Sequence, residues 1–174
     1  MRALFLLIPI VLLFCFNTFQ PIAQHFDYPV GKPNALGYYN AQEFGENGHL
    51  GEDWNASTRG NSDLGAPVYA IANGRVKFAQ NIGGGWGNVI RITHELPDHS
   101  FVESLYAHCD TVLVQENQIV TRGEEIGTIG TANGQYIAHL HLELRNDTTL
   151  PIGGGYSNSS KGYLHPTAFI KGHR

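Results

Sequence analysis

A short run near the C-terminus alternates polar and apolar residues, and it reads Ala-His-Leu-His-Leu-Glu-Leu-Arg over residues 138–145. Successive side chains of an extended strand point to opposite faces, so the polar and apolar residues of this run are predicted to separate. The polar face would carry His139, His141, Glu143 and Arg145. Two imidazoles at positions i and i+2 can converge on one site, as a pair of metal ligands or as one ligand beside an acid or base. Taken alone, such a pair is more typical of a solvated strand face.

A histidine and a carboxylate lie four residues apart in His49-Leu-Gly-Glu-Asp53, which is close enough to bind one cation. This spacing would place them on one face of a helix. Gly48 and Gly51 favour instead a loop or the start of a strand that folds tightly around the ion. Glu52 is the competing carboxylate, and we expect it to be solvated. Taken alone, the pattern is more typical of a hydrogen-bonded surface pair.

A third pattern is strand-like and places a histidine beside a cysteine. Strict alternation predicts that Tyr106 and His108 share one face, and that the other face carries Leu105, Ala107 and Cys109. Cys109 is therefore interpreted as a small buried hydrophobic residue. A cysteine peptidase that uses Cys109 is disfavoured because the neighbouring His108 would point the opposite way.

The elements that must position these residues have the pattern of short strands. Four stretches alternate as half-buried strands do, namely residues 67–72, 89–94, 101–109 and 138–145. Residues 112–129 show short strands and turns, and no long amphipathic helix is predicted anywhere. The 21 glycines and 8 prolines are spread along the chain, which indicates many tight turns. The sequence therefore predicts a β-rich fold.

Length and composition indicate one folded domain of ordinary size. The chain has 174 residues, of which 42% are hydrophobic and 15% charged, so it can bury a core large enough to fold. The formal net charge is −4 and no basic run is present, which argues against a nucleic-acid partner. We expect a monomer.

The N-terminus has the features of an export signal, because Arg2 precedes an apolar run over residues 3–16. A membrane-spanning helix needs roughly 20 residues, and Pro9 interrupts this shorter run. We interpret residues 1–23 as a cleaved signal peptide, in preference to an uncleaved anchor. The mature chain would then be residues 24–174, beginning with an irregular segment at 24–47.

Only two cysteines occur in the chain, and Cys15 lies within the export segment. The mature chain would hold Cys109 alone and no internal disulfide. Lipidation of Cys15 is disfavoured because Leu13 and Phe14 are large where a lipoprotein signal has small residues.

Taken together and in this order, the motifs resemble those of the lysostaphin-type zinc metalloendopeptidases, the M23 or LytM-like family. The resemblance covers residues 45–168. It rests on six motifs: His49-x-x-x-Asp53, Gly65-Ala-Pro-Val-Tyr-Ala70, Gly87-Asn-Val-Ile90, Tyr106-Ala-His108, Gly123 through Ile126-Gly127, and His139-Leu-His141. Two departures are the stretch 130–137, which lacks the usual Ser/Thr-Gly-Pro, and Leu142, where phenylalanine is frequent.

The resemblance implies an all-β fold in which mainly antiparallel sheets form an open groove, as in the duplicated hybrid motif. It implies that zinc is held by His49, Asp53 and His141. His108 and His139 match the two active-site histidines that do not bind the metal, and which of them is the general base stays open. Residues 83–87, with Trp86 at a hairpin tip, and residues 153–161 are expected to form groove walls.

The function implied is hydrolysis of peptide bonds in peptidoglycan stem peptides or cross-bridges. Export would place the enzyme in the periplasm, cell envelope or extracellular space, with no membrane partner beyond the export segment. The alternative is a non-catalytic LytM-like module that activates other cell-wall hydrolases. Such modules typically lose metal ligands, whereas all five site positions are present here, which favours the enzyme.

Overall fold

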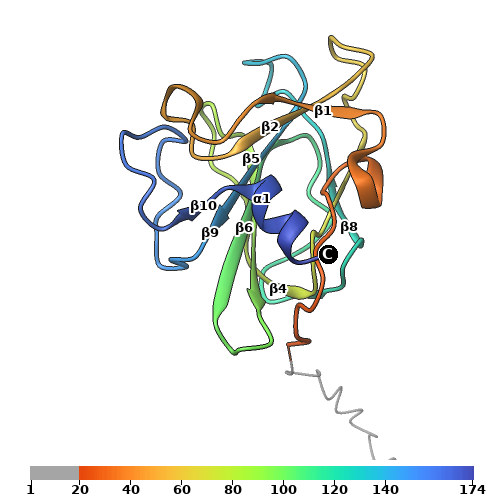
Figure 1. Ribbon diagram of the computed structural model, residues 1–174. Helices are drawn as coiled ribbons and strands as arrows, with labels where there is room; N and C mark the ends of the chain where they lie inside the picture. The colour runs from red at the N-terminus through yellow and green to blue at the C-terminus, as the bar shows by residue number, and fades with distance from the viewer. Residues whose placement is uncertain (1–19) are drawn as a thin grey trace, which may run out of the picture.

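The structure is a computed structural model that describes residues 20–174 (Figure 1). The predicted signal peptide, with Cys15, lies outside the described residues except for its last four positions. These four pack on the domain: the Ala23 side chain is buried, and the Ala23 amide donates to the Glu95 carbonyl at 2.7 Å. Within residues 20–174, no helix is both long and apolar enough to cross a bilayer.

Antiparallel strands dominate the described chain and form one large and one small sheet. The large sheet has the order β1-β2-β9-β6-β5-β4-β7, and β10 also pairs with β9. Its strands are β1 (Tyr38–Gln42), β2 (Glu52–Ala56), β4 (Gly74–Asn81), β5 (Asn88–Glu95), β6 (Phe101–Cys109), β7 (Ile119–Val120), β9 (Leu140–Arg145) and β10 (Tyr163–Leu164). The small sheet pairs β3 (Pro67–Tyr69) with β8 (Glu125–Thr128). The predicted all-β, mainly antiparallel fold is confirmed.

Helical structure is limited to short pieces among the described residues. They are η1 (Gly31–Ala35), η2 (Glu46–Gly48) and α1 (Pro166–Gly172). Helix α1 lies across one face of the large sheet near β9 and β6 (Figure 1). The segment 24–47, predicted to be irregular, contains strand β1. The predicted strand 67–72 ends at Tyr69, and β4 was not predicted.

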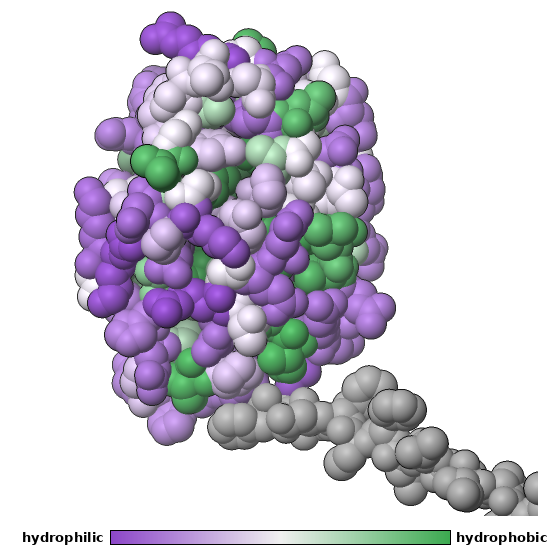
Figure 2. Space-filling view, turned by 90° about the vertical axis from the view of Figure 1, so that its right-hand side faces the viewer, coloured by the Kyte–Doolittle hydropathy of each residue, from purple (hydrophilic) through white to green (hydrophobic). Residues whose placement is uncertain are grey.

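The main core lies on the face of the large sheet that carries the leucines of β9. Leu140, Leu142 and Leu144 are fully buried, and they belong to one cluster with Ile126 of β8 and Ile170 of α1. The predicted separation of the leucines from the polar residues is therefore correct. Figure 2 shows that the face of the molecule viewed there is mainly hydrophilic, with hydrophobic side chains in separate small groups.

The polar face of β9 is not solvated, in contrast to the common situation for an alternating strand. His141 is 3% exposed, and Glu143 and Arg145 are fully buried. Arg145 donates to the carbonyls of Pro151 and Ile152, so the loop after β9 folds back over this face. Both faces of the strand are therefore covered, one by apolar and one by charged partners.

The predicted alternation of β6 fails at its last two residues. Tyr106 and Cys109 both belong to the main core, whereas Leu105 and Ala107 pack on the other face with Val89. The cause is a left-handed backbone at His108, with φ of 64°, which turns its side chain to the face opposite Tyr106. The interpretation of Cys109 as a buried residue is correct, and burial raises the pKa of its thiol to about 12.

A glycine allows another segment to lie directly on this turn of the backbone. A Cβ atom at Gly130 would lie 2.3 Å from the His108 carbonyl oxygen, which is too close for any side chain. Gly130 also forms a β-bridge with His139, just before β9. This close approach places His108 and His139 on neighbouring segments. These are the two histidines that the family resemblance assigns to the active site but not to the metal.

The expectation that Glu52 is solvated is wrong. Glu52 is fully buried, because alternation along β2 sends it to the face opposite Asp53, where α1 packs. Its carboxylate accepts hydrogen bonds from the Thr167 amide at 3.1 Å and the Thr167 hydroxyl at 2.8 Å. His165 Nδ1 lies 3.0 Å from the same carboxylate. Glu52 therefore anchors the start of α1.

His94 is a structural histidine in the core. It is fully buried, with Nδ1 2.8 Å from the Asn73 carbonyl and Nε2 2.7 Å from the Ser104 hydroxyl. Burial lowers the pKa of His94 to about 4, although the hydrogen bond to Asn73 opposes this shift.

We predict that His94 makes folding stability fall as the pH drops from about 6.5 to about 4. In this window the unfolded chain binds a proton that the folded His94 does not, so protonation favours unfolding by about 3 kcal/mol. His94→Gln keeps a hydrogen-bonding side chain but removes the titration. Urea unfolding at several pH values, with a chelator present, should give the variant a shallower dependence, and parallel curves for the two proteins would refute this role.

Candidate active site

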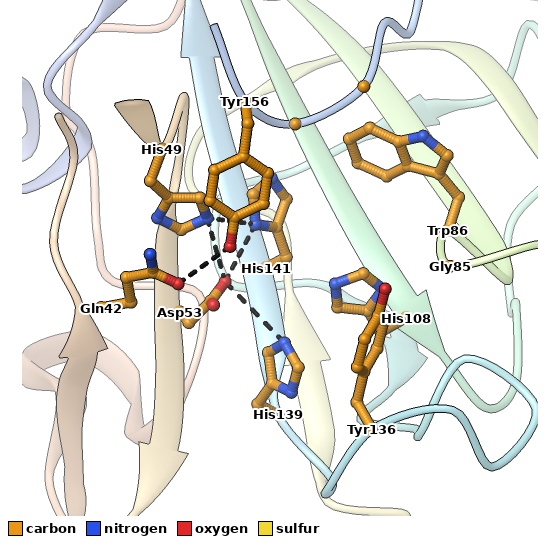
Figure 3. Close-up of a pocket in the computed structure, with 12 residues that line it drawn as sticks. Gln42, His49, Asp53, Gly85, Trp86, His108, Tyr136, His139, His141 and Tyr156 are labelled. Atoms are coloured by element: carbon orange, nitrogen blue, oxygen red, sulfur yellow. Dashed lines mark hydrogen bonds and ion pairs between the residues drawn. The ribbon is translucent and has the colours of Figure 1, made fainter. Parts of the chain in front are cut away.

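A groove of about 470 Å³ contains all five site residues that the sequence predicted. These residues are His49, Asp53, His108, His139 and His141, and they come from three neighbouring strands and the segments just before them (Figure 3). Gln42 of β1 and loop residues from three further segments complete the walls.

Strand pairing places the central residues. Asp53 of β2 lies directly opposite His141 of β9, and Ala107 of β6 lies opposite His141 on its other side. Directly opposed residues of an antiparallel pair point to the same face, so Asp53 and His141 must meet there. His49 precedes β2 and is held by an isolated β-bridge to Tyr156.

Three potential ligand atoms converge at the floor of the groove (Figure 3). His49 Nε2 and His141 Nδ1 are 3.0 Å apart. Asp53 Oδ1 lies 2.9 Å from His141 Nδ1 and 3.4 Å from His49 Nε2. His49 and His141 are almost fully buried, whereas Asp53 is partly accessible from the groove.

The charges of this cluster depend on each other. Burial raises the pKa of Asp53, but hydrogen bonds to His141 and His49 outweigh burial and hold the pKa well below its usual range. Burial lowers the pKa of His141, but its hydrogen bonds to Asp53 and Glu143 outweigh this effect and raise the pKa to about 9. Asp53 is therefore an ionised carboxylate at neutral pH.

His108 and His139 lie together beside this cluster, with ring centroids 4.7 Å apart. His139 Nδ1 is 2.8 Å from the Ile137 carbonyl oxygen, which can only accept, so Nδ1 carries the proton. The other nitrogen, Nε2, faces the cluster at 3.8 Å from Asp53 Oδ1. Burial, with repulsion from His141 and His139, lowers the pKa of His108 to about 3.

Trp86 lies at the rim of the groove, as predicted for the hairpin tip between β4 and β5. Its indole N–H donates to the Gly153 carbonyl at 3.1 Å, and its backbone carbonyl accepts from the His108 amide at 3.0 Å. The ring lies edge-on to His141, with centroids 5.5 Å apart. Trp86 thus joins one wall loop to two of the site histidines.

Two tyrosines and a glutamine in the groove were not predicted from the sequence. The Tyr156 hydroxyl donates to Gln42 Oε1 at 3.0 Å, and its ring lies 5.1 Å from the His49 ring. Tyr136 stands on the other side, 5.1 Å from the His108 ring. The glycine-rich composition of residues 153–161 predicted a wall loop but not which side chain enters the groove.

Comparisons with known proteins agree with this arrangement. The sequence pattern described as Peptidase family M23 matches residues 47–152. The "Lipoprotein NlpD" of Yersinia enterocolitica is 44% identical over 81 residues, which are 47% of this chain and 78% of that protein. The "Murein hydrolase activator NlpD" of Escherichia coli K12 is 39% identical over 104 residues, which are 56% of this chain. The match spans 26% of that activator's length.

Solved structures show the same fold. Lysostaphin from Staphylococcus simulans superposes with a TM-score of 0.62 at 22% identity, over 88% of this chain and 55% of that chain. A putative M23 peptidase from Pseudomonas aeruginosa gives a TM-score of 0.61 at 21% identity, over 87% of this chain and 53% of that chain. The chain therefore belongs to peptidase family M23, with the fold of the lysostaphin-type, LytM-like members.

Proposed function

We propose that this chain is a zinc-dependent endopeptidase that hydrolyses peptide bonds in the stem peptides or cross-bridges of peptidoglycan. The observation that carries this proposal is the convergence of two imidazole nitrogens and one carboxylate oxygen on a single point. This point lies at the floor of an open groove, beside two further histidines that could act on a substrate.

The three converging residues fit zinc. Nitrogen and oxygen atoms bound tetrahedrally to zinc at about 2.0–2.2 Å lie roughly 3.3–3.6 Å from each other. Among His49, Asp53 and His141 one separation, 3.4 Å, lies in this range, and the other two, 3.0 and 2.9 Å, are a few tenths of an ångström shorter, so these side chains would move slightly apart around the ion. Three protein ligands would leave one position for water or substrate, as a catalytic zinc site requires. Bound zinc would polarise the scissile carbonyl and lower the pKa of water in the groove.

The hydrogen bonds of His139 make it the better candidate for the general base. Because its Nδ1 proton is donated to the Ile137 carbonyl, neutral His139 presents the lone pair of Nε2 to the groove. His139 would take the proton of the attacking water and pass it to the leaving amine. We assign to His108, on the side of Trp86 and Tyr136, a hydrogen bond to the developing oxyanion of the substrate.

The groove suits a peptide more than an anionic ligand. Its walls are aromatic rings and glycines, and no lysine or arginine is among the described residues that line it. Aromatic rings and exposed glycine backbone can contact a peptide main chain without ion pairing. We therefore propose a peptidoglycan peptide as substrate and zinc as cofactor. We further propose that residues 1–23 direct export to the periplasm, cell envelope or extracellular space and are then cleaved.

A second candidate function is activation of other cell-wall hydrolases. Relatives that are 39% identical are named murein hydrolase activators, which favours this candidate. The complete set of His49, Asp53 and His141 favours the enzyme, because a binding module has no use for a metal site beside two further histidines.

We expect His141→Ala to abolish zinc binding, because it removes one of three ligands. His139→Ala and His108→Ala should retain about one zinc per chain but lose activity by about 10² to 10⁴-fold, since neither holds the ion. Metal analysis and peptidase assays on the three folded variants separate these outcomes. Parental activity in either His139→Ala or His108→Ala would overturn its assignment.

Gly51→Ala should weaken zinc binding although residue 51 offers no ligand. A Cβ atom there would lie 2.7 Å from His141 Cε1 and 2.6 Å from the Leu142 carbonyl oxygen, so the imidazole would have to move. We expect at least a roughly 10-fold loss of zinc affinity in chelator competition. Gly172→Ala, where a Cβ meets nothing within 4 Å, is the control and should bind zinc normally. Equal zinc affinities of Gly51→Ala and the parent protein would show that Gly51 does not restrict the position of the His141 ring.

Digestion of purified peptidoglycan tests the substrate. Mass spectrometry of the released fragments should show new amine and carboxyl ends within stem peptides or cross-bridges. Release of sugar ends alone would contradict a peptidase. No release by the zinc-loaded protein, together with stimulation of a separate wall hydrolase, would favour the activator instead.

A further inference from the structure

Behind the groove lies a cluster of buried charges that the proposed chemistry does not use. Glu103, Glu143 and Arg145 are fully buried, and Arg91 is 7% exposed. Buried charges are unfavourable unless each is closely paired. Here Arg91 Nε lies 2.8 Å from Glu103 Oε1, and Arg145 Nε lies 2.9 Å from Glu143 Oε2. The cluster is therefore satisfied internally and has one fixed arrangement.

Glu143 also contacts His141, one of the three proposed zinc ligands. Its Oε1 lies 3.2 Å from His141 Nε2, while its Oε2 accepts two hydrogen bonds from Arg145. An ionised carboxylate can only accept, so the Nε2 of His141 carries a proton. In the metal-free molecule the opposite nitrogen, Nδ1, faces the ionised Asp53 carboxylate in the same way and carries a proton as well. Zinc bound at Nδ1 would displace that proton and leave the proton on Nε2, which Glu143 accepts.

His49 and His141 differ in whether the ring nitrogen that faces away from the other ligands has a hydrogen-bond partner. His49 Nδ1 is buried and has no hydrogen-bond partner among the described residues. His141 alone of the pair has a carboxylate on the side away from the groove.

Arg145 connects this carboxylate to the wall of the groove. It donates to the carbonyls of Pro151 at 2.9 Å and Ile152 at 2.8 Å. The chain then continues directly to Gly154, Gly155 and Tyr156, which line the groove. One buried ion pair therefore holds both a metal-facing imidazole and the start of a wall loop.

We propose that Glu143, held in place by Arg145, is a positioning residue that fixes the tautomer and ring orientation of His141 for zinc. This inference rests on the proposed zinc function of His141. Carboxylates that accept the second N–H of a metal-bound histidine typically change metal affinity by about 10 to 100-fold when removed. Glu143 acts through His141 and touches neither substrate nor metal.

Glu143→Gln compared with Glu103→Gln tests the proposal. Both changes remove one fully buried carboxylate from the same cluster, but Glu103 pairs with Arg91, Lys77 and, at 3.6 Å, Arg145, and it lies opposite Arg145 in the sheet rather than beside His141. A merely structural role predicts similar losses of stability and equal zinc affinity in the two folded variants. We expect zinc affinity to fall about 10 to 100-fold in Glu143→Gln and to change less than about 3-fold in Glu103→Gln. Equal affinities would overturn the proposal.

If Glu143→Gln does not fold, a second measurement on the parent protein still tests the proposal. In the zinc-loaded parent, two-dimensional ¹H–¹⁵N NMR should detect a slowly exchanging proton on His141 Nε2. A proton on Nδ1, or rapid exchange at Nε2, would overturn the role of Glu143. If the folded parent binds no zinc at all, the proposed function itself fails, and this outcome is distinct from the other two.

Discussion

The antiparallel register between β2 and β9 is the constraint on which the rest of the site depends. It places Asp53 directly opposite His141, so that a carboxylate and an imidazole meet on one face without help from a long loop. His49 needs only the short turn before β2 to join them. A shift of one residue would send Asp53 to the α1 side and bring Glu52 to the groove, because side chains alternate along a strand.

A polar row in the middle of a sheet must be paired if both faces of the sheet are covered. The fold meets this requirement with Glu143, Arg145, Glu103 and Arg91, and with carbonyls of the loop after β9. The same contacts that compensate for the buried charge also fix the ring of His141. At Glu143 and Arg145 stability and site geometry therefore depend on the same contacts, since β9 carries both these charges and the His141 of the groove floor.

Sequence periodicity predicted those parts of the fold that depend on local alternation. The gathering of the five site residues was implied by the family resemblance, whereas the burial of Leu140, Leu142 and Leu144 followed from periodicity. Periodicity failed where one backbone angle or a distant segment decides which face a side chain takes or whether it is buried. The φ of 64° at His108 reverses the alternation, and the burial of Glu52 depends on α1, more than 100 residues later. Tyr136 and Tyr156 lie in loops, whose paths are set by tertiary contacts.

The claim that His49, Asp53 and His141 together hold one zinc ion can be tested directly by anomalous diffraction at the zinc absorption edge from zinc-loaded crystals. We predict a single strong peak at about 2.0–2.2 Å from His49 Nε2, Asp53 Oδ1 and His141 Nδ1. A zinc peak bonded to other residues, or no peak in crystals of the folded protein supplied with excess zinc, would contradict it.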